Sequence, residues 1–334
     1  LSIFGDHQDI YACRQTGAAM LCSHSVQEIA DLSPMAHLLA INSSSPVIDF
    51  FDGFRTSHEI QNVEFVDDEN WKELLDLEKV EEFRKRALNP HGHAVTRGGA
   101  ENDDICFQGR EAQNVHEANI VTEAEKLFKQ VSELTGRTYA PFVYYGAKDA
   151  TKVIIAMGSV TETAHEVIDD LMAKGEKVGM VKVHLYRPFS AKHLIAAIPS
   201  TVTKIAVLDR TKEPGSLGEP LYLDVVAALE QENRHVDVLV GGRYGISSKD
   251  TQPNQIKAVY DFLDSEKPFT GFTIGINDDV THLSLPVDSE YHVNNTYTSC
   301  FSRVISKISL SILMSCITNN LNGRLICRNC TITA

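Results

Sequence analysis

Two short polar segments carry the side chains best suited to chemistry. Segment 5–9 contains Asp6 and His7, and segment 52–59 contains Arg55 and His58. A carboxylate, an imidazole and a guanidinium close together can move a proton or hold an anionic group. Asp and Gly are also what a tight turn requires, so a solvated turn is an equally weighted interpretation of each segment.

The position of these segments favours a site. Each follows a stretch typical of a buried strand, at 1–4 and at 46–51. In parallel α/β sheets, ligands bind beyond the carboxyl ends of the strands. We therefore expect Asp6, His7, Arg55 and His58 to structure a cofactor-facing edge.

The rest of the chain supplies the elements that position such an edge. Helices are predicted from Ser25, where a capping box begins, and at 71–88 and 117–134, the last ended by Gly136. From 141 onward strands and helices alternate, which predicts a parallel sheet covered on both faces and a unit, 141–265, that folds by itself. The strands are expected at 153–158, 178–186, 205–208 and 236–240, and the helices at 161–173, 191–197, 219–230 and 254–263.

Two further turns follow strands of this second unit. Segment 157–161 precedes a helix, so its backbone amides form a candidate anion site, although it lacks a nucleotide-binding glycine motif. The charges of 209–215 are expected to pair with one another at a domain interface. Histidines such as His91, His93, His184 and His193 are too dispersed for a metal cluster, and we expect no metal site.

Composition narrows the class of protein. The 334 residues carry a net charge of −14, which argues against binding to nucleic acid. Seven cysteines in this length do not make a disulfide scaffold and favour a reduced, intracellular protein. The chain opens at Leu1 inside a strand-like stretch, so we expect the true N-terminus, and any targeting signal, to precede it.

Residues 301–334 differ from the rest, because they contain no acidic residue. A membrane segment at 304–317 would be short and would contain Lys307. The lone pair Cys327 and Cys330 is a weak metal signal. The favoured interpretation is that this tail is not the native continuation, and we expect it to be loosely attached.

The loops together resemble the pyruvate:ferredoxin (flavodoxin) oxidoreductase family, over about residues 1–300. The stretches that carry the resemblance are 5–17, 50–59, 185–189, 208–215, 242–245 and 278–281. The resemblance implies an α/β fold in which an incomplete thiamine-diphosphate-binding (pyrimidine-type) domain precedes a transketolase C-terminal-like domain with a parallel sheet. It places the end of the first domain at 1–140, the second domain at 141–265, the start of a third at 266–300 and the atypical tail at 301–334.

The resemblance also implies an activity: oxidative decarboxylation of pyruvate to acetyl-CoA and CO₂, with electrons passed to ferredoxin or flavodoxin. It implies thiamine diphosphate, Mg²⁺, [4Fe-4S] clusters and coenzyme A in the full-length enzyme, a homodimer, and a cytoplasmic or hydrogenosomal location without membrane or nucleic-acid binding. The family's catalytic glutamate and arginine lie upstream of Leu1, and its diphosphate-binding and cluster motifs do not occur in this sequence. No catalytic residue is therefore assigned, and the chain alone is expected to be inactive. The alternatives are a non-catalytic interaction module or part of a pyruvate:NADP⁺ fusion enzyme.

Overall fold

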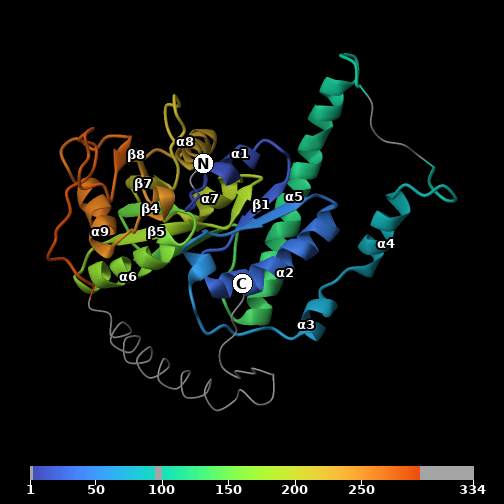
Figure 1. Cartoon of the computed structure of the whole chain (residues 1–334), viewed down its shortest axis with the longest axis horizontal. Helices are drawn as coiled ribbons and strands as arrows, with labels where there is room; N and C mark the ends of the chain where they lie inside the picture. Colours follow the sequence, from blue (N-terminus) through green and yellow to red (C-terminus); the bar gives the residue numbers. More distant parts are fainter. Residues whose placement is uncertain (1–2, 95–99, 294–334) are drawn as a thin grey trace, which may run out of the picture.

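The computed structural model describes residues 3–94 and 100–293 and contains two sheets that meet along one side (Figure 1). The first part of the chain contributes two of the three strands of the small sheet and the helices around it. Its elements are α1 (Gln8–Cys13), β1 (Ala19–Cys22), α2 (Val26–Ser43), β2 (Val47–Phe50), the short 3₁₀ helix η1 (Thr56–His58), α3 (Asp68–Glu73), α4 (Leu77–Arg86) and α5 (Cys106–Thr135).

The second part builds the larger sheet. Its elements are β3 (Phe142–Gly146), β4 (Lys152–Ala156), α6 (Val160–Ala173), β5 (Val178–Val183), β6 (Leu185–Arg187), α7 (Ala191–Ala197), β7 (Lys204–Asp209), α8 (Pro220–Gln231), β8 (Val238–Arg243), the 3₁₀ helix η2 (Ile246–Ser248), α9 (Pro253–Phe262) and β9 (Phe272–Thr273). The strand order is β3-β5-β4-β7-β8-β9, and every pair is parallel except β3 with β5.

Strand β4 shows how the sequence produces this layered fold. All its residues are buried, with Val153 and Ile155 in one hydrophobic cluster and Ile154 and Ala156 in another. Successive side chains of a strand point to opposite faces, so an unbroken apolar run needs cover on both sides. Helices α7 and α8 cover one face, and α6 and α9 cover the other. The predicted α/β class is confirmed.

The two sheets share one hydrophobic core. Met20 and Phe50 of the small sheet belong to the same buried cluster as Val153 of the large one. Strand β6 belongs to the small sheet, where it pairs antiparallel with β1. The prediction of one strand over 178–186 is therefore wrong: the chain leaves the large sheet after β5, passes His184 and joins the small sheet as β6.

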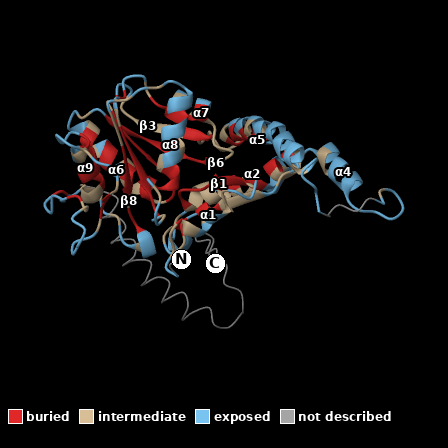
Figure 2. Cartoon of the chain, turned by 90° about the horizontal axis from the view of Figure 1, so that it is seen from above, coloured by how far each residue is buried: buried red, intermediate tan, exposed pale blue. Residues whose placement is uncertain are grey.

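Helices α2 and α5 form a further layer. Leu32 and Leu39 of α2 pack in one cluster with Leu127 and Phe128 of α5. Helix α5 begins earlier than predicted. Its first half projects from the body, and almost all the residues there are exposed (Figures 1 and 2). Most residues of α4 are exposed as well. Gly136, at φ +71°, ends α5 as predicted.

The single helix predicted at 71–88 is two helices, α3 and α4. Asp76 stands between them, and its Oδ1 accepts hydrogen bonds from the amides of Glu78 at 2.9 Å and Lys79 at 3.2 Å. A side-chain cap of this kind satisfies the free amides at the start of a helix. It therefore makes α4 a separate element.

The ends of the described chain differ from expectation in one respect. Ile3 and Phe4 form a turn, so the predicted strand at 1–4 is wrong in its described part.

Residues 266–293 lie against the large sheet, where β9 pairs with β8 and Phe272 and Leu285 are buried beside α9. The domain boundaries stay predictions, and the tail at 301–334 lies outside the described residues. None of the helices in the described ranges has the length and apolar character needed to cross a bilayer.

Candidate functional site at the strand ends

Asp52 lies at the centre of the junction between the two sheets. It follows β2 closely, and its side chain is fully buried. One carboxylate oxygen, Oδ1, lies 2.5 Å from His7 Nε2 and 3.1 Å from Arg210 Nη1. The other, Oδ2, accepts hydrogen bonds from the Ser159 amide at 2.8 Å and the Ser159 hydroxyl at 2.6 Å. The turns after β2, β4 and β7 therefore converge on one carboxylate.

The surroundings of Asp52 keep it ionised. Burial alone would raise the pKa of this carboxyl, but His7, Arg210 and the Ser159 hydroxyl outweigh burial and hold the pKa well below its usual range. Arg210 is itself buried, and its Nε donates to the Gly245 carbonyl at 3.0 Å. The strand ends of both sheets are thus locked together by a buried ion pair.

Gly158 allows the turn after β4 to approach Asp52. It adopts φ +88°, and a Cβ built there would lie 2.8 Å from both Asp52 carboxylate oxygens. Only glycine avoids both the left-handed strain and this clash. The anion site predicted at 157–161 is accordingly filled from within the protein, because the Asp52 carboxylate takes the amide at the start of α6.

A second buried carboxylate, Asp209, fastens α1 to the large sheet. It accepts hydrogen bonds from the Tyr11 hydroxyl at 2.7 Å and from the amides of Leu221 at 3.0 Å and Tyr222 at 3.1 Å, at the start of α8. Burial is the main reason that the pKa of Asp209 is raised to about 6.

The charges of 209–215 were expected to pair with one another. Instead Arg210 pairs with Asp52, and Glu213 pairs across the interface with Arg14 at 3.3 Å.

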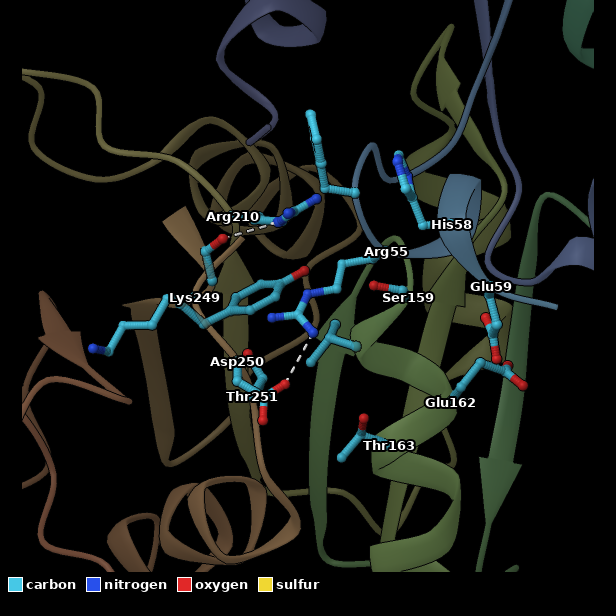
Figure 3. A pocket seen from close by; sticks show the side chains of 14 residues that line it. Arg55, His58, Glu59, Ser159, Glu162, Thr163, Arg210, Lys249, Asp250 and Thr251 are labelled. Atoms are coloured by element: carbon cyan, nitrogen blue, oxygen red, sulfur yellow. Dashed lines mark hydrogen bonds and ion pairs between the residues drawn. The ribbon is translucent and has the colours of Figure 1, made fainter. Parts of the chain in front are cut away.

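An open cleft with a volume of about 330 Å³ lies beside this network (Figure 3). It opens where β2, β4, β7 and β8 end, at the edge where ligands bind in parallel sheets. The lining residues come from the segments that follow these four strands, including the start of α6, and are Phe54, Arg55, His58, Glu59, Ser159, Val160, Glu162, Thr163, Arg210, Tyr244, Gly245, Lys249, Asp250 and Thr251.

Of the four predicted site residues, two line the cleft, one belongs to the buried network and one belongs to neither. Arg55 and His58 line the cleft, and His7 is buried against Asp52. Asp6 accepts the Gln8 amide at 2.9 Å, which is turn chemistry. Arg55 is held by Asp250 at 3.0 Å, and the His58 ring stacks on Phe54 with centroids 4.9 Å apart.

Three residues of the site were given no role there by the prediction. Asp52 opens the predicted polar segment 52–59 and is the hub of the network, and Arg210 pairs with it. Lys249 adds a cation to the lining of the cleft, without an ion pair among the described residues. Lys249 follows β8 closely, so the rule that ligands lie at strand ends could have found it. The pairing of Arg210 with Asp52 spans two sheets, and no local pattern signals it.

Comparisons with known proteins agree with this architecture. The family described as "Pyruvate flavodoxin/ferredoxin oxidoreductase, thiamine diP-bdg" matches residues 1–129, and "Pyruvate:ferredoxin oxidoreductase core domain II" matches residues 150–256. The pyruvate-flavodoxin oxidoreductase of Enterobacter agglomerans is 55% identical over 287 residues, which cover 86% of this chain and 24% of that protein. The pyruvate:ferredoxin oxidoreductase of Moorella thermoacetica is 51% identical, with the same shares covered.

A pyruvate-flavodoxin oxidoreductase sequence from a Nostoc species is shorter. It is 48% identical over 294 residues, which cover 88% of this chain and 72% of that sequence. Against the Enterobacter and Moorella proteins, by contrast, this chain spans about a quarter of their length. At this level of identity and coverage, the chain belongs to the pyruvate:ferredoxin (flavodoxin) oxidoreductase family.

Proposed function

We propose that this chain is one part of an enzyme that decarboxylates pyruvate oxidatively. In that reaction pyruvate and coenzyme A give acetyl-CoA, CO₂ and a proton, and two electrons pass to ferredoxin or flavodoxin. The observation that carries the proposal is the match of both units to that family, in order and at 48–55% identity. In this enzyme the chain forms one side of a cofactor-binding site.

The cleft supports that role for thiamine diphosphate or coenzyme A, both of which are anionic. Arg55, His58 and Lys249 line it from two strand ends, together with the carboxylates of Glu59, Glu162 and Asp250, and the Asp52 network beneath holds those ends in place. Bound thiamine diphosphate supplies the carbanion chemistry of the reaction. We propose that Arg55 and Lys249 orient an anionic group at the edge of the cleft, and that Asp6 and His7 fix the backbone below it.

Iron–sulfur clusters and Mg²⁺ do not fit the residues described here. A cluster needs several converging thiolates, whereas the described cysteines are Cys13, Cys22 and Cys106, which form no common group. Within the described residues, a single group of three metal-ligating side chains occurs, and it lies away from the cleft. We therefore propose that both cofactors are held by other parts of the full-length enzyme, which is a homodimer in the cytoplasm or a hydrogenosome.

The proposal is tested by transplanting the chain. The matching 287-residue segment of the Enterobacter agglomerans enzyme is replaced by the segment from this chain, and pyruvate-dependent reduction of a viologen dye is measured with coenzyme A. We expect the chimera to be active and the isolated chain to be inactive, since the chain spans only about a quarter of the full-length relatives. A folded, cofactor-loaded chimera without activity would instead support a non-catalytic interaction module.

The role of the cleft is tested in the same chimera. Lys249→Gln removes a cation from the cleft and is expected to raise the KM for coenzyme A or the concentration of thiamine diphosphate needed, about tenfold for a lost charged contact. The matched control is Lys126→Gln, an exposed lysine on α5. If both variants behave like the parent, the cleft does not contact either cofactor.

A further inference from the structure

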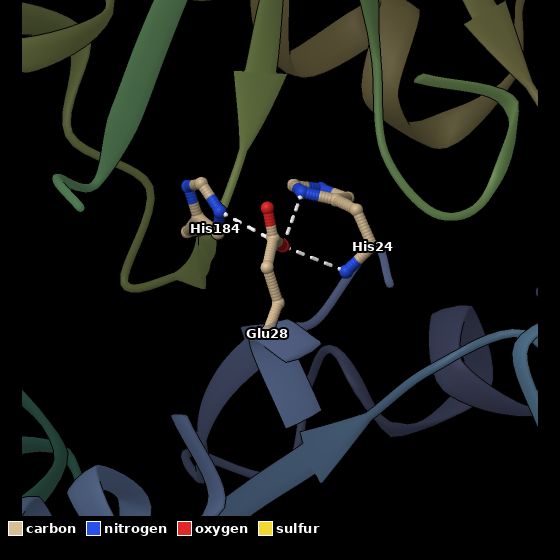
Figure 4. Close-up of side chains that lie close together, drawn as sticks. All are labelled: His24, Glu28 and His184. Atoms are coloured by element: carbon tan, nitrogen blue, oxygen red, sulfur yellow. Dashed lines mark hydrogen bonds and ion pairs between the residues drawn. The ribbon is translucent and has the colours of Figure 1, made fainter. Parts of the chain in front are cut away.

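A cluster of two imidazoles and one carboxylate lies outside the cleft (Figure 4). His24 lies just before α2, Glu28 lies in its first turn, and His184 lies between β5 and β6. Glu28 Oε2 lies 2.9 Å from His24 Nδ1 and 3.2 Å from His184 Nε2. The three donor atoms all lie within 4.8 Å of one another, and both histidines are almost completely buried.

The hydrogen bond on the far side of His24 leaves a lone pair facing this cluster. His24 Nε2 lies 3.2 Å from the Val183 carbonyl oxygen, which can only accept, so Nε2 carries the proton. In the neutral ring Nδ1 is then an unprotonated acceptor. It lies beside the Glu28 carboxylate without making a hydrogen bond, although it is buried. Two acceptors brought together in this way require a positive centre between them.

The Glu28 carboxylate divides its oxygens between two tasks. Oε2 faces the imidazoles, and Oε1 lies 3.7 Å from Lys182 Nζ. Lys182 also donates to Glu162 at 2.9 Å, so its charge is already balanced. Oε2 also accepts a hydrogen bond from the His24 amide at 2.8 Å, so the oxygen that faces the imidazoles is fixed in place and keeps its remaining lone pair for a ligand. Carboxylates that ligate metals are commonly held by hydrogen bonds of this kind.

We propose that His24, Glu28 and His184 bind one divalent transition-metal ion of the zinc type. Two imidazole nitrogens and a carboxylate oxygen are the donors that Zn²⁺ prefers, and ligand atoms on tetrahedral Zn²⁺ lie about 3.3 Å apart. The separations of 2.9 and 3.2 Å from Glu28 Oε2 are close to this value, and the two imidazole nitrogens lie within 4.8 Å of each other. Solvent takes the fourth position, and Glu28, the partly exposed member, marks the path of access.

The site would act structurally, because its ligands join α2 to the point where the chain passes from one sheet to the other. This inference concerns a site apart from the cleft and does not depend on the proposed activity. The competing occupant is a proton that converts His24 to an imidazolium and fills the same gap. A titration with metal separates the two, since a proton gives no saturable metal binding.

The test uses the whole chain freed of metal by a chelator. Zn²⁺ is titrated by calorimetry, and Co²⁺ is added as an optical probe. We expect one Zn²⁺ per chain at micromolar or lower Kd, a rise of several degrees in Tm with Zn²⁺, and the visible absorption bands of tetrahedral Co²⁺. Absence of saturable binding by the unaltered, folded chain overturns the proposal without any variant.

Variants then locate the ion. His184→Gln and His24→Gln are each expected to weaken Zn²⁺ binding at least a hundredfold and to abolish the Co²⁺ bands. His193→Gln, at a partly exposed histidine beside Glu125, is the matched control and should bind as the parent does. If His184→Gln and His24→Gln fold and bind Zn²⁺ as tightly as the control, the ion is held elsewhere and the assignment is wrong.

Discussion

At the scale of single residues, Asp52 holds the junction of the two sheets together. It is fully buried, lies within ion-pair distance of His7 and Arg210, and accepts a hydrogen bond from the Ser159 hydroxyl. Asp52→Asn removes the charge that balances buried Arg210, and we expect it to lower the free energy of unfolding by about 3–5 kcal/mol. Urea unfolding measures this loss. Asp149→Asn, in the exposed pair with Lys177, is the control and should leave the midpoint unchanged.

Asp209 gives the molecule a distinctive pH response. Its folded pKa is raised to about 6 from an unfolded value near 4, so between these values the folded state binds more protons than the unfolded state. The contribution of Asp209 to stability therefore falls as pH rises from 4 to 7, by about 3 kcal/mol at most. We expect the difference in unfolding free energy between the parent and Asp209→Asn to shrink over that range. A difference that grows with pH would mean that Asp209 is stabilised in its charged form.

At the scale of elements, the end of α5 depends on one glycine. Gly136 adopts φ +71°, and a Cβ built there meets no atom within 4 Å. Gly136→Ala therefore tests backbone strain alone, and we expect a loss of about 1 kcal/mol in denaturant unfolding. Gly53→Ala is the matched control, because its Cβ is equally unobstructed and its φ lies outside the left-handed region. Equal losses in both variants would exclude strain at Gly136 as the cause.

The elements also show what sequence patterns can and cannot predict. Buried strands such as β4 and helices such as α6 follow from apolar periodicity, because each lies against the same layers along its whole length. The passage from β5 to β6 at His184 could not be predicted, since both stretches are buried and strand-like and differ only in the sheet they join. In the site, the strand-end rule located Arg55 and His58, whereas Asp52 and Arg210 meet only through tertiary structure.

At the scale of the whole molecule, the shared core makes the two parts interdependent. The sequence predicted that 141–265 folds by itself, yet β6 pairs with β1, and Tyr186 is buried against Tyr11 with ring centroids 5.4 Å apart. We expect the excised segment 141–293 to be less stable than the same segment in the chain, on the order of 2 kcal/mol or more, because it exposes such residues. Hydrogen exchange of β4 in both contexts measures the difference. Equal protection would show that the large sheet is autonomous.

The carboxylate of Asp52 also competes with anions from solution for the amide of Ser159. It is a tethered anion, held 2.8 Å from the Ser159 amide by the fold itself, and a tethered group acts at a very high effective concentration. Free phosphate or a diphosphate in solution cannot displace it at ordinary concentrations. The start of α6 is therefore closed to outside anions by an intramolecular ligand, and any anionic guest is left to the cations at the open rim, Arg55 and Lys249.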